Sequence, residues 1–324
     1  MRTLVTGADG FAGSHLAEYL LSQDQEVIAL VRNEKEVANL ASFRSRLHLE
    51  EVEVRDEARV LKVLRNTKPE RIYHLAAMSS PSASIGDPRL TYDVNFGGTL
   101  NILCAWRQLQ FDCRLLFVSS ADVYGSPRNE DLPLREDAPF RPANPYAGSK
   151  AASELLACQF FQSYGLPIVR VRPFNHTGPR QSEAFFCSNL ARQIAAIDAG
   201  GRPLNVTTGN LKVRRDFSDV RDIVRGYFLL LEKGEGGDVY QLCSGQPVPL
   251  ESILQILSSL ISKPITAFVD ASRMRSGEAP VVWGDPSKTK VATSWTPQYD
   301  LETTLRDLKL YWDQRILPGR AATS

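Results

Sequence analysis

The chain has 324 residues, of which 43% are hydrophobic and 23% charged, and its net charge is +1. This composition is that of an ordinary soluble globular protein, and the charge balance excludes a general attraction to nucleic acid or to a membrane surface. No apolar run approaches the roughly 20 residues that a membrane-spanning helix needs, and no secretory pattern precedes the first predicted strand. The five cysteines are scattered and lack a C-x-x-C spacing, so we expect free thiols in a cytoplasmic protein.

Strand-like and helix-like patterns alternate along the first half of the chain. Strands are predicted at Thr3–Thr6, Glu26–Val31, Leu47–Val54, Arg71–Leu75, Leu115–Ser119 and Pro167–Arg172. Helices are predicted between them at Phe11–Ser22, Asp56–Asn66, Asp87–Leu109 and from about residue 144 to Tyr164. This alternation predicts an α/β fold, a doubly wound parallel sheet of the Rossmann type with helices on both faces.

The pattern changes after residue 172. Residues 173–215 are rich in Gly, Pro and Asn and contain one predicted helix. The later predicted elements are a strand at Asp238–Leu242 and helices at Phe185–Ala199, Val220–Lys233, Leu250–Ser262 and Asp300–Gln314. We therefore predict a dinucleotide-binding domain of residues 1–172 with about 216–245, and a smaller C-terminal α/β substrate domain of residues 173–215 and 246–324.

A glycine-rich turn follows the first predicted strand and opens the first helix. Its glycines have the spacing GxxGxxG, which permits a tight turn at Gly7, an approach of the backbone to a pyrophosphate at Gly10 and close packing at Gly13. The N–H groups at the helix start favour an anion. The sequence therefore predicts a dinucleotide site with contacts from Gly7, Asp9, Gly10, Phe11, Ala12 and Gly13.

The end of the second strand predicts which dinucleotide binds. An acidic residue there would bind the ribose hydroxyls, whereas an arginine accommodates a 2′-phosphate. The chain has Val31-Arg32-Asn33 at this point, so Arg32 favours NADP(H), with NAD(H) as the alternative. Asp56, after the third strand, is suited either to the adenine amine or to capping the next helix.

Tyr146 and Lys150 are four residues apart, so they share one face of a helix. An ammonium group beside the phenol would lower its pKa toward the working pH. A hydroxyl from Ser120, at the end of an apolar run, could hold a substrate oxygen while Tyr146 gives it a proton. The sequence thus predicts that these three residues are catalytic.

These motifs, with the glycine turn and in this order, resemble the extended short-chain dehydrogenase/reductases, which act on nucleotide sugars. The resemblance rests on Leu75-Ala76-Ala77, Asn95, Ser119-Ser120, and Tyr146 with Lys150. It implies further cofactor contacts from Leu75, Ala76, Ala77, Asn95, Ser119, Tyr146, Lys150, Pro173 and His176. For His176, a structural role is the open alternative. In this family, helices such as 87–109 and 144–164 pair across a two-fold axis, so the resemblance also implies a homodimer.

The second half of the chain resembles the GDP-mannose 4,6-dehydratases and the GDP-4-keto-6-deoxy-D-mannose reductases. The similar stretches are Arg172-Pro173-Phe174-Asn175-His176-Thr177-Gly178-Pro179-Arg180-Gln181, Ala191-Arg192-Gln193-Ile194, Gly209-Asn210-Leu211, Arg215-Asp216-Phe217-Ser218-Asp219-Val220-Arg221-Asp222 and Val239-Tyr240-Gln241-Leu242-Cys243-Ser244-Gly245. A last stretch, Arg273-Met274-Arg275-Ser276-Gly277-Glu278, resembles the segment that closes over GDP, although many members have proline at the position of Ser276.

This resemblance implies a GDP-sugar substrate. Arginine forks bind a diphosphate well, and a carboxylate such as Glu278 is suited to guanine or to ribose hydroxyls. For each arginine, an interdomain salt bridge is the structural alternative. The implied substrate contacts come from Ser120, Asp122, Tyr146, Asn175, Asn189, Arg192, Asn210, Arg215, Arg275 and Glu278.

The segment Ser120-Ala121-Asp122 bears on the reaction. The resembling dTDP-glucose dehydratases have Thr-Asp-Glu here, and the GDP-mannose dehydratases have a glutamate that matches Asp122. The shorter Asp122 holds its carboxylate about 1.5 Å further back, a misplacement that can cost ~100-fold in rate. The sequence therefore favours reduction of GDP-4-keto-6-deoxy-D-mannose to GDP-D-rhamnose, with Asp122 as an orienting group. The alternatives are a GDP-mannose 4,6-dehydratase and another nucleotide-sugar epimerase or reductase.

Overall fold

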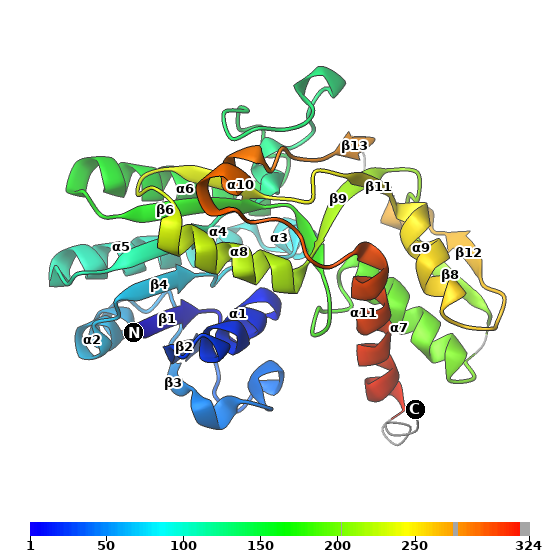
Figure 1. Ribbon diagram of the computed structural model, residues 1–324, viewed down its shortest axis with the longest axis horizontal. Coiled ribbons are helices and arrows are strands. Elements are labelled where there is room, and N and C mark those ends of the chain that lie inside the picture. Colours follow the sequence, from blue (N-terminus) through cyan, green and yellow to red (C-terminus); the bar gives the residue numbers. More distant parts are fainter. Residues whose placement is uncertain (202, 275–277, 318–324) are drawn as a thin grey trace.

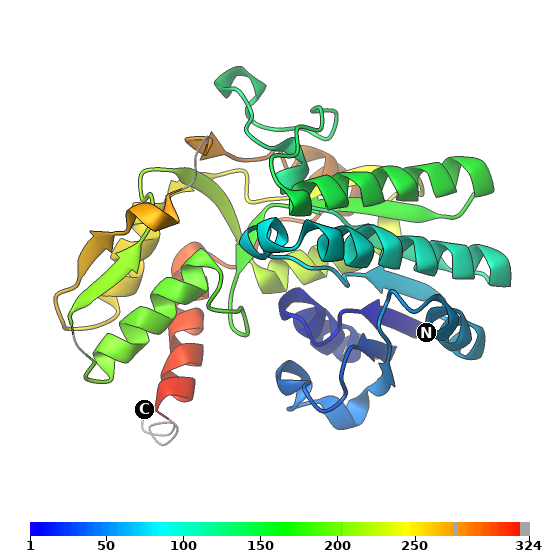
Figure 2. The same ribbon diagram turned by 180° about the vertical axis from the view of Figure 1, so that it is seen from behind.

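A computed structural model describes residues 1–201, 203–274 and 278–317 of the protein (Figures 1 and 2). The strands are β1 (Arg2–Thr6), β2 (Glu26–Val31), β3 (His48–Glu51), β4 (Arg71–His74), β5 (Arg114–Val118), β6 (Ile168–Pro173), β7 (Asn175–Thr177), β8 (Asn205–Thr208), β9 (Arg214–Asp219), β10 (Val239–Leu242), β11 (Pro247–Pro249), β12 (Thr266–Val269) and β13 (Val281–Val282). The α-helices are α1 (Phe11–Ser22), α2 (Glu57–Thr67), α3 (Pro81–Gly86), α4 (Pro88–Tyr92), α5 (Gly98–Leu109), α6 (Pro145–Tyr164), α7 (Phe186–Asp198), α8 (Val220–Lys233), α9 (Leu250–Ser259), α10 (Ser287–Thr293) and α11 (Leu301–Ile316).

The main sheet has seven parallel strands in the order β10-β6-β5-β4-β1-β2-β3. Its central strands are apolar and buried along nearly their whole length, as strands covered on both faces must be. The chain leaves β1 in one direction toward β2 and returns on its other side through β4. The predicted doubly wound α/β fold is confirmed.

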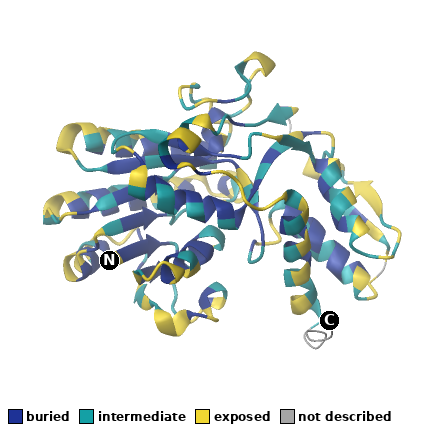
Figure 3. Cartoon of the chain, in the orientation of Figure 1, coloured by how far each residue is buried: buried dark blue, intermediate teal, exposed yellow. Residues whose placement is uncertain are grey.

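Helices cover both faces of this sheet (Figures 1 and 3). On one face, α1 and α8 bury residues such as Leu16, Leu20 and Leu230 against the strands. On the other face, α2, α5 and α6 form a second apolar cluster. Trp295 packs in the first cluster. Trp295 therefore packs with the main sheet, although the predicted division assigns residues 246–324 to the substrate domain.

The rest of the chain forms a smaller region beside the sheet (Figure 1). Its core joins α7, α9 and α11, and contains Ile194, Leu257 and Leu308. A sheet of order β11-β9-β13, to which β7 is added through β9, lies between this core and the main sheet. These strands have between two and six residues, and those of two or three residues are too short to show an alternating pattern in the sequence.

The predicted helix 87–109 differs from the structure. Asp87 caps α4, a π-helical turn follows at Asp93–Gly97, and α5 begins at Gly98. Asn95 lies within this turn and is buried. Among the helices that the described residues form, none combines the length and apolar character that a membrane crossing requires.

Candidate active site

The predicted site residues gather where four neighbouring strands end. β1, β4, β5 and β6 are adjacent and parallel, so their carboxyl ends meet at one edge of the sheet. Thr6, His74, Val118 and Pro173 end these strands, and the segments that follow carry most of the predicted catalytic and cofactor residues. Open α/β sheets bind ligands outside this edge, where the strand order changes direction. Here that point lies between β1 and β4.

The turn after β1 is too closely packed for larger residues. Gly7 has a φ of +66°, and a Cβ atom there would lie 2.9 Å from Ala76 Cα. A Cβ atom at Gly13 would lie 2.1 Å from the Gly7 carbonyl oxygen. Gly10 is the N-cap of α1, and no side chain in the described part of the protein caps this helix. Its first N–H groups are therefore placed for an anion, and the turn fits the pyrophosphate of a dinucleotide.

Ser119 provides a second sign that a polar molecule belongs at this edge. Its hydroxyl is buried, and it has no hydrogen-bond partner within the residues that the structure describes. A buried hydroxyl without a partner costs free energy, so a ligand group at the carboxyl end of β5 would stabilise it. The residues present fit the predicted dinucleotide.

His74 belongs to the site, although the sequence analysis gave it no role. Thr99 Oγ1 donates its proton to the Asn95 carbonyl at 2.6 Å. The Thr99 oxygen therefore accepts a hydrogen bond from His74 Nε2 at 3.0 Å. His74 Nδ1 then accepts from Thr6 Oγ1 at 2.8 Å. Burial, and after it the charge of Lys150, lowers the pKa of His74 to about 3. The imidazole is therefore neutral and has one fixed tautomer.

This hydrogen-bond chain holds the loop that follows β4. Thr6 Oγ1 accepts from the backbone N–H groups of Leu75 and Ala76 at 3.1 and 3.0 Å. The loop is thereby fixed against the Gly7 turn. The cofactor contacts predicted for Leu75, Ala76 and Ala77 remain predictions. A histidine directly before Leu75-Ala76-Ala77, at a strand end, was the sequence signal for this arrangement.

Tyr146 lies in the first turn of α6, where Asn144 Oδ1 caps the helix by accepting from Ala147 N–H at 2.9 Å. The Ser120 hydroxyl hydrogen-bonds to the Tyr146 phenol. The Asp122 carboxylate is close enough for its charge to act on the same phenol. The structure thus brings together three of the predicted catalytic residues, two from the segment after β5 and one from α6.

The predicted net lowering of the Tyr146 pKa toward the working pH is wrong. Burial, and then the charge of Asp122, raises the pKa of Tyr146 above its usual value, and the hydrogen bond to Ser120 only opposes this rise. The Lys150 ammonium lies over the Phe117 ring, 4.9 Å from its centroid. The sequence spacing could not show how strongly burial penalises the phenolate. The neutral phenol is the form that a proton donor requires.

Lys150 lies one turn after Tyr146 on α6 and is 4% exposed. Burial lowers the pKa of Lys150 to about 8, and the charge of Glu154 opposes this shift. The lysine is therefore charged at neutral pH and becomes neutral in mildly alkaline solution.

Asn95 connects the loop after β4 with α6. Its Nδ2 donates to the Met78 carbonyl at 3.2 Å and to Ser149 Oγ at 2.8 Å. Its Oδ1 accepts from Met78 N–H at 2.7 Å. Both donors of the amide are used within the protein, so the structure gives Asn95 a positioning role, and its predicted contact with the cofactor stays a prediction.

The residues predicted for the adenosine end lie at the carboxyl ends of β1, β2 and β3. Arg32 is exposed directly after β2, and its charge reaches Asp9, whose pKa burial raises. Asn39 Nδ2 donates to the Asp9 carbonyl at 3.0 Å. Asp56 caps α2 by accepting from Arg59 N–H at 3.0 Å. The helix-cap alternative for Asp56 is thus confirmed, whereas adenine recognition stays a prediction.

His176 has the structural role that the sequence left open. Its ring stacks on the Phe11 ring with centroids 5.8 Å apart, and its Nδ1 lies 2.9 Å from the Phe174 carbonyl oxygen. Burial lowers the pKa of His176, so the ring is neutral. His176 thereby joins β7 to Phe11, the first residue of α1 and the neighbour of Gly10. Pro173 ends β6 two residues before this strand.

Arg180 makes a second connection between these regions that the sequence analysis did not assign. Its NH2 lies 2.7 Å from His15 Nδ1 and 2.5 Å from Glu18 Oε2 on α1. His15 Nε2 lies 2.8 Å from the Pro179 carbonyl, so this nitrogen carries the proton. Arg180 has a φ of +72°, which is unfavourable for a side chain of this size. Arg180 stood in a stretch that resembles the GDP-sugar enzymes, which was its only sequence signal.

Arg215 and Glu278, both predicted to bind the substrate, are partners of each other. Arg215 NH2 lies 3.1 Å from Glu278 Oε1, a salt bridge that joins two segments of the predicted substrate domain and not two domains. Asn175 Nδ2 donates to the Asp216 carbonyl at 3.2 Å, next to Arg215 in the chain. The Asp216 side chain is buried and accepts from Ser244 Oγ at 2.6 Å. Three predicted substrate residues thus lie near the middle of the small sheet.

The other predicted substrate residues belong to α7, to the loop after β8 and to the segment before β13. Asn189 Nδ2 donates to the Glu183 carbonyl at 3.0 Å, and Arg192 forms an ion pair with the Glu183 side chain. Asn210 Oδ1 accepts a backbone N–H two residues further on at 3.0 Å. Arg275 lies outside the described residues. No contact in the described part of the chain joins these residues to Tyr146, so their role stays a prediction.

This arrangement of turn, Ser120, Tyr146 and Lys150 can be compared with known proteins. A family model described as GDP-mannose 4,6 dehydratase matches residues 4–308. The chain belongs to this family. The GDP-6-deoxy-D-mannose reductase of Pseudomonas aeruginosa is 33% identical over 97% of this chain and 98% of its own length. A GDP-mannose 4,6-dehydratase of Vibrio cholerae is 28% identical over 95% of this chain and 94% of its own length.

The fold also agrees with a solved structure. The structure of RMD from Pseudomonas aeruginosa complexed with NADPH has a TM-score of 0.85 and 31% identity to this chain, and covers 97% of it and 99% of the solved chain. The Pseudomonas reductase is thus more similar in sequence to this chain than the Vibrio dehydratase is.

Proposed function

We propose that this protein is an NADP(H)-dependent nucleotide-sugar oxidoreductase that reduces the C4 ketone of GDP-4-keto-6-deoxy-D-mannose to give GDP-D-rhamnose. The observation that carries the proposal is the group formed by Ser120, Asp122 and Tyr146, together with the 33% identity to a GDP-6-deoxy-D-mannose reductase. This group provides a neutral phenol to donate a proton, and its carboxylate is the short Asp122 in place of the glutamate that the resembling dehydratases have.

The chain's own residues have distinct roles in this reduction. The reduced nicotinamide, when bound, supplies the hydride for the ketone carbon. Tyr146 gives its proton to the ketone oxygen, and Ser120 holds that oxygen by a hydrogen bond. Lys150 carries a positive charge that stabilises the phenolate left on Tyr146 until the proton is replaced from solvent. Asp122 orients the sugar by accepting from a hydroxyl group.

The dinucleotide is held by the turn of Gly7, Gly10 and Gly13, with Ser119 as a polar contact at the carboxyl end of β5. Arg32 binds the 2′-phosphate, which distinguishes NADP(H) from NAD(H). The smaller domain, built around the core of α7, α9 and α11, binds the GDP part, and Arg215 is its phosphate ligand. The separate apolar core of that region supports the assignment of GDP binding to a second domain.

A GDP-mannose 4,6-dehydratase is the second candidate, because the Asp122 carboxylate acts on Tyr146 and could serve as a base near the sugar. Another nucleotide-sugar epimerase or reductase is the remaining alternative. A noncatalytic dinucleotide sensor is disfavoured, because it would need none of Ser120, Tyr146 and Lys150.

Product identification by NMR decides between these functions. GDP-4-keto-6-deoxy-D-mannose with NADPH, and GDP-mannose with NADP⁺, are offered in separate reactions. We expect GDP-D-rhamnose from the first and no 4-keto product from the second. Formation of the 4-keto sugar from GDP-mannose would assign the dehydratase activity instead, and inertness toward both sugars would reject both assignments.

The active form is proposed to be a cytoplasmic homodimer. The five cysteines are all free, as in a reducing compartment. α5 and α6 lie side by side on one face of the molecule (Figure 2), and Leu155 on α6 is 58% exposed. Sedimentation of the wild type and of Leu155→Glu tests this assembly: a dimer that dissociates in the variant supports pairing through α6, and a monomeric wild type contradicts it.

A further inference from the structure

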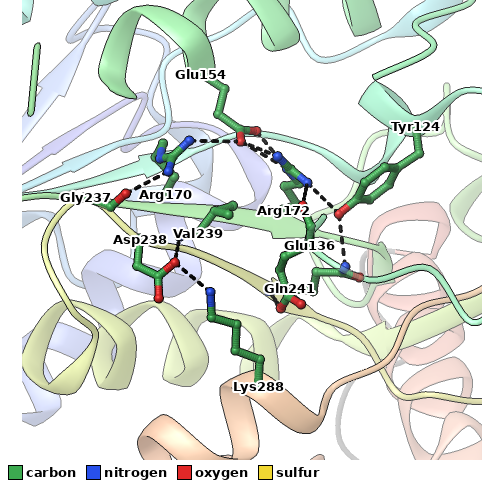
Figure 4. Close-up of polar contacts among 10 residues, drawn as sticks. All are labelled: Tyr124, Glu136, Glu154, Arg170, Arg172, Gly237, Asp238, Val239, Gln241 and Lys288. Carbon is green, nitrogen blue, oxygen red and sulfur yellow. Dashed lines mark hydrogen bonds and ion pairs between the residues drawn. The ribbon is translucent and has the colours of Figure 1, made fainter. Parts of the chain in front are cut away.

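Glu154 is a buried carboxylate on the helix that carries Tyr146 and Lys150 (Figure 4). It lies one turn beyond Lys150, and its side chain is 0% exposed. A carboxylate in such a place is costly unless it is paired and hydrogen-bonded. Arg172 at the end of β6 supplies the partner: its Nε lies 3.1 and 3.0 Å from the two oxygens, and its NH2 lies 2.6 Å from Oε1.

The other amino group of Arg172 reaches the segment that carries the proposed serine. Arg172 NH1 donates to Tyr124 Oη at 2.7 Å, and Gln241 Nε2 of β10 donates to the same oxygen at 3.0 Å. Tyr124 ends the single 3₁₀ turn Ala121–Tyr124, which begins directly after Ser120. Arg172 also lies against the Tyr124 ring, 5.0 Å from its centroid. One guanidinium thus joins α6 to the Ser120 segment, as Figure 4 shows.

Several charged groups surround this connection. Glu154 faces Arg170 of β6 at 3.7 Å, in addition to Arg172 and Lys150. On the far side, Arg172 NH1 also donates to the Glu136 carbonyl at 2.8 Å. The Glu136 side chain accepts from Gln241 N–H at 3.0 Å, and Lys288 of α10 acts on its charge.

Lys150 has a different set of neighbours on its other sides. His74 of β4 is neutral, and Phe117 of β5 presents its ring. Glu154 is the anion that opposes the effect of burial on the Lys150 pKa. Loss of the Glu154 charge would therefore leave Lys150 surrounded by neutral groups and by the cations of β6.

We propose that Glu154, Arg172 and Tyr124 form one positioning unit for the reaction proposed above, which sets Ser120 against Tyr146 and keeps Lys150 charged. The inference rests on the proposed roles of Ser120, Tyr146 and Lys150. None of the three members touches the reacting atoms. Tyr124 acts on geometry through its hydroxyl, and Glu154 acts on both geometry and charge.

Two variants separate these effects. Tyr124→Phe keeps the ring but removes the hydrogen bonds to Arg172 and Gln241, so kcat should fall about tenfold, with KM and the pH profile unchanged. Glu154→Gln removes the charge, so we expect two effects. kcat should fall, and the alkaline limb of the kcat/KM profile should move to lower pH. A two-dimensional NMR titration of lysine labelled at Cε, assigned with Lys150→Arg, should show the same downward move of the Lys150 pKa without any substrate.

Glu232→Gln is the matched control, because Glu232 pairs with Arg71 at the opposite end of the sheet. It should leave kcat and the pH limb as in the wild type. The proposal is overturned if Glu154→Gln and Tyr124→Phe lose thermal stability but keep the wild-type kcat and pH profile. If Glu154→Gln does not fold, a wild-type kcat in Tyr124→Phe is sufficient to overturn it. If the wild type does not reduce the keto sugar, the proposed function fails, and the Lys150 titration in Glu154→Gln still decides the effect of Glu154.

Discussion

The two ends of the proposed site hold their charged groups in different ways. At the proton-donor end, Lys150 is 4% exposed and is placed by buried side chains on α6, β4 and β5. At the substrate end, Arg215 and Glu278 are 16% and 19% exposed and pair with each other. The first end is therefore arranged before any ligand binds. At the second end, a diphosphate would have to replace the carboxylate as the partner of the arginine.

The largest effect should come from Tyr146→Phe, which removes the proton donor. We expect kcat to fall by about 10²–10⁴-fold, the usual contribution of a positioned acid. The dissociation constant of NADPH, measured by fluorescence, should stay nearly unchanged. Tyr164→Phe at the exposed end of the same helix is the control, and near-normal turnover by the Tyr146 variant would remove this residue as the donor.

Arg215→Ala tests the substrate end. Loss of a charge-assisted hydrogen bond of about 1.5–3 kcal/mol should raise KM for the GDP-sugar by ~10–100-fold and leave kcat within a few-fold. Arg214→Ala is the control and should leave KM unchanged, since the exposed Arg214 side chain donates to the Pro247 carbonyl at 3.0 Å. A large fall in kcat with constant KM would place Arg215 in the chemistry and not in recognition.

The pH dependence distinguishes the proton-donor end from the rest of the molecule. The pKa of Lys150 is lowered to about 8, so the lysine is charged below this pH and neutral above it. The rate of ketone reduction, as kcat/KM, should therefore fall about tenfold per pH unit above this value. His74, with a pKa near 3, does not titrate in this range. A profile that stays flat up to pH 10 would contradict the role of the Lys150 charge.

Arg32→Ala should have the smallest effect, because this side chain is exposed to solvent. We expect about a tenfold rise in KM for NADPH and no change for NADH, since only the former carries a 2′-phosphate. Lys35→Ala, three residues further on and also exposed, is the control. Equal specificity constants for both cofactors in the wild type, unchanged by Arg32→Ala, would defeat the proposed preference for NADPH.

The sequence analysis was most accurate for the elements that have a continuous apolar pattern. β1, α1, β2 and α8 were predicted to within one residue, because each combines a continuous apolar pattern with clear end signals. The strands β7, β11 and β13 were missed, since two or three residues form no period, and the longer β8, β9 and β12 were missed as well. β9 has six residues, but most of them are polar or charged, so they form no apolar pattern. The π-turn at Asn95 was missed because its cause, the packing of Asn95 against Met78 and Ser149, is not local.

The pKa of Tyr146 shows the same limit for chemistry. The spacing of Tyr146 and Lys150 correctly predicted one helix face, but the expected acidification of the phenol was wrong. Burial and the Asp122 charge come from segments distant in the chain, and both raise the pKa of the phenol. Geometry that depends on neighbours in sequence was predictable, whereas the electrostatic field was not.

By itself, the sequence determined the parallel sheet, the glycine turn and the pairing of Tyr146 with Lys150 on one helix, because hydrophobic periodicity and backbone sterics act over a few residues. The tertiary structure alone decided that His74 is neutral, that Arg215 pairs with Glu278, and that Arg172 joins Glu154 to the Ser120 segment. Each of these depends on burial and on contacts between distant segments, and both exist only once the chain has folded.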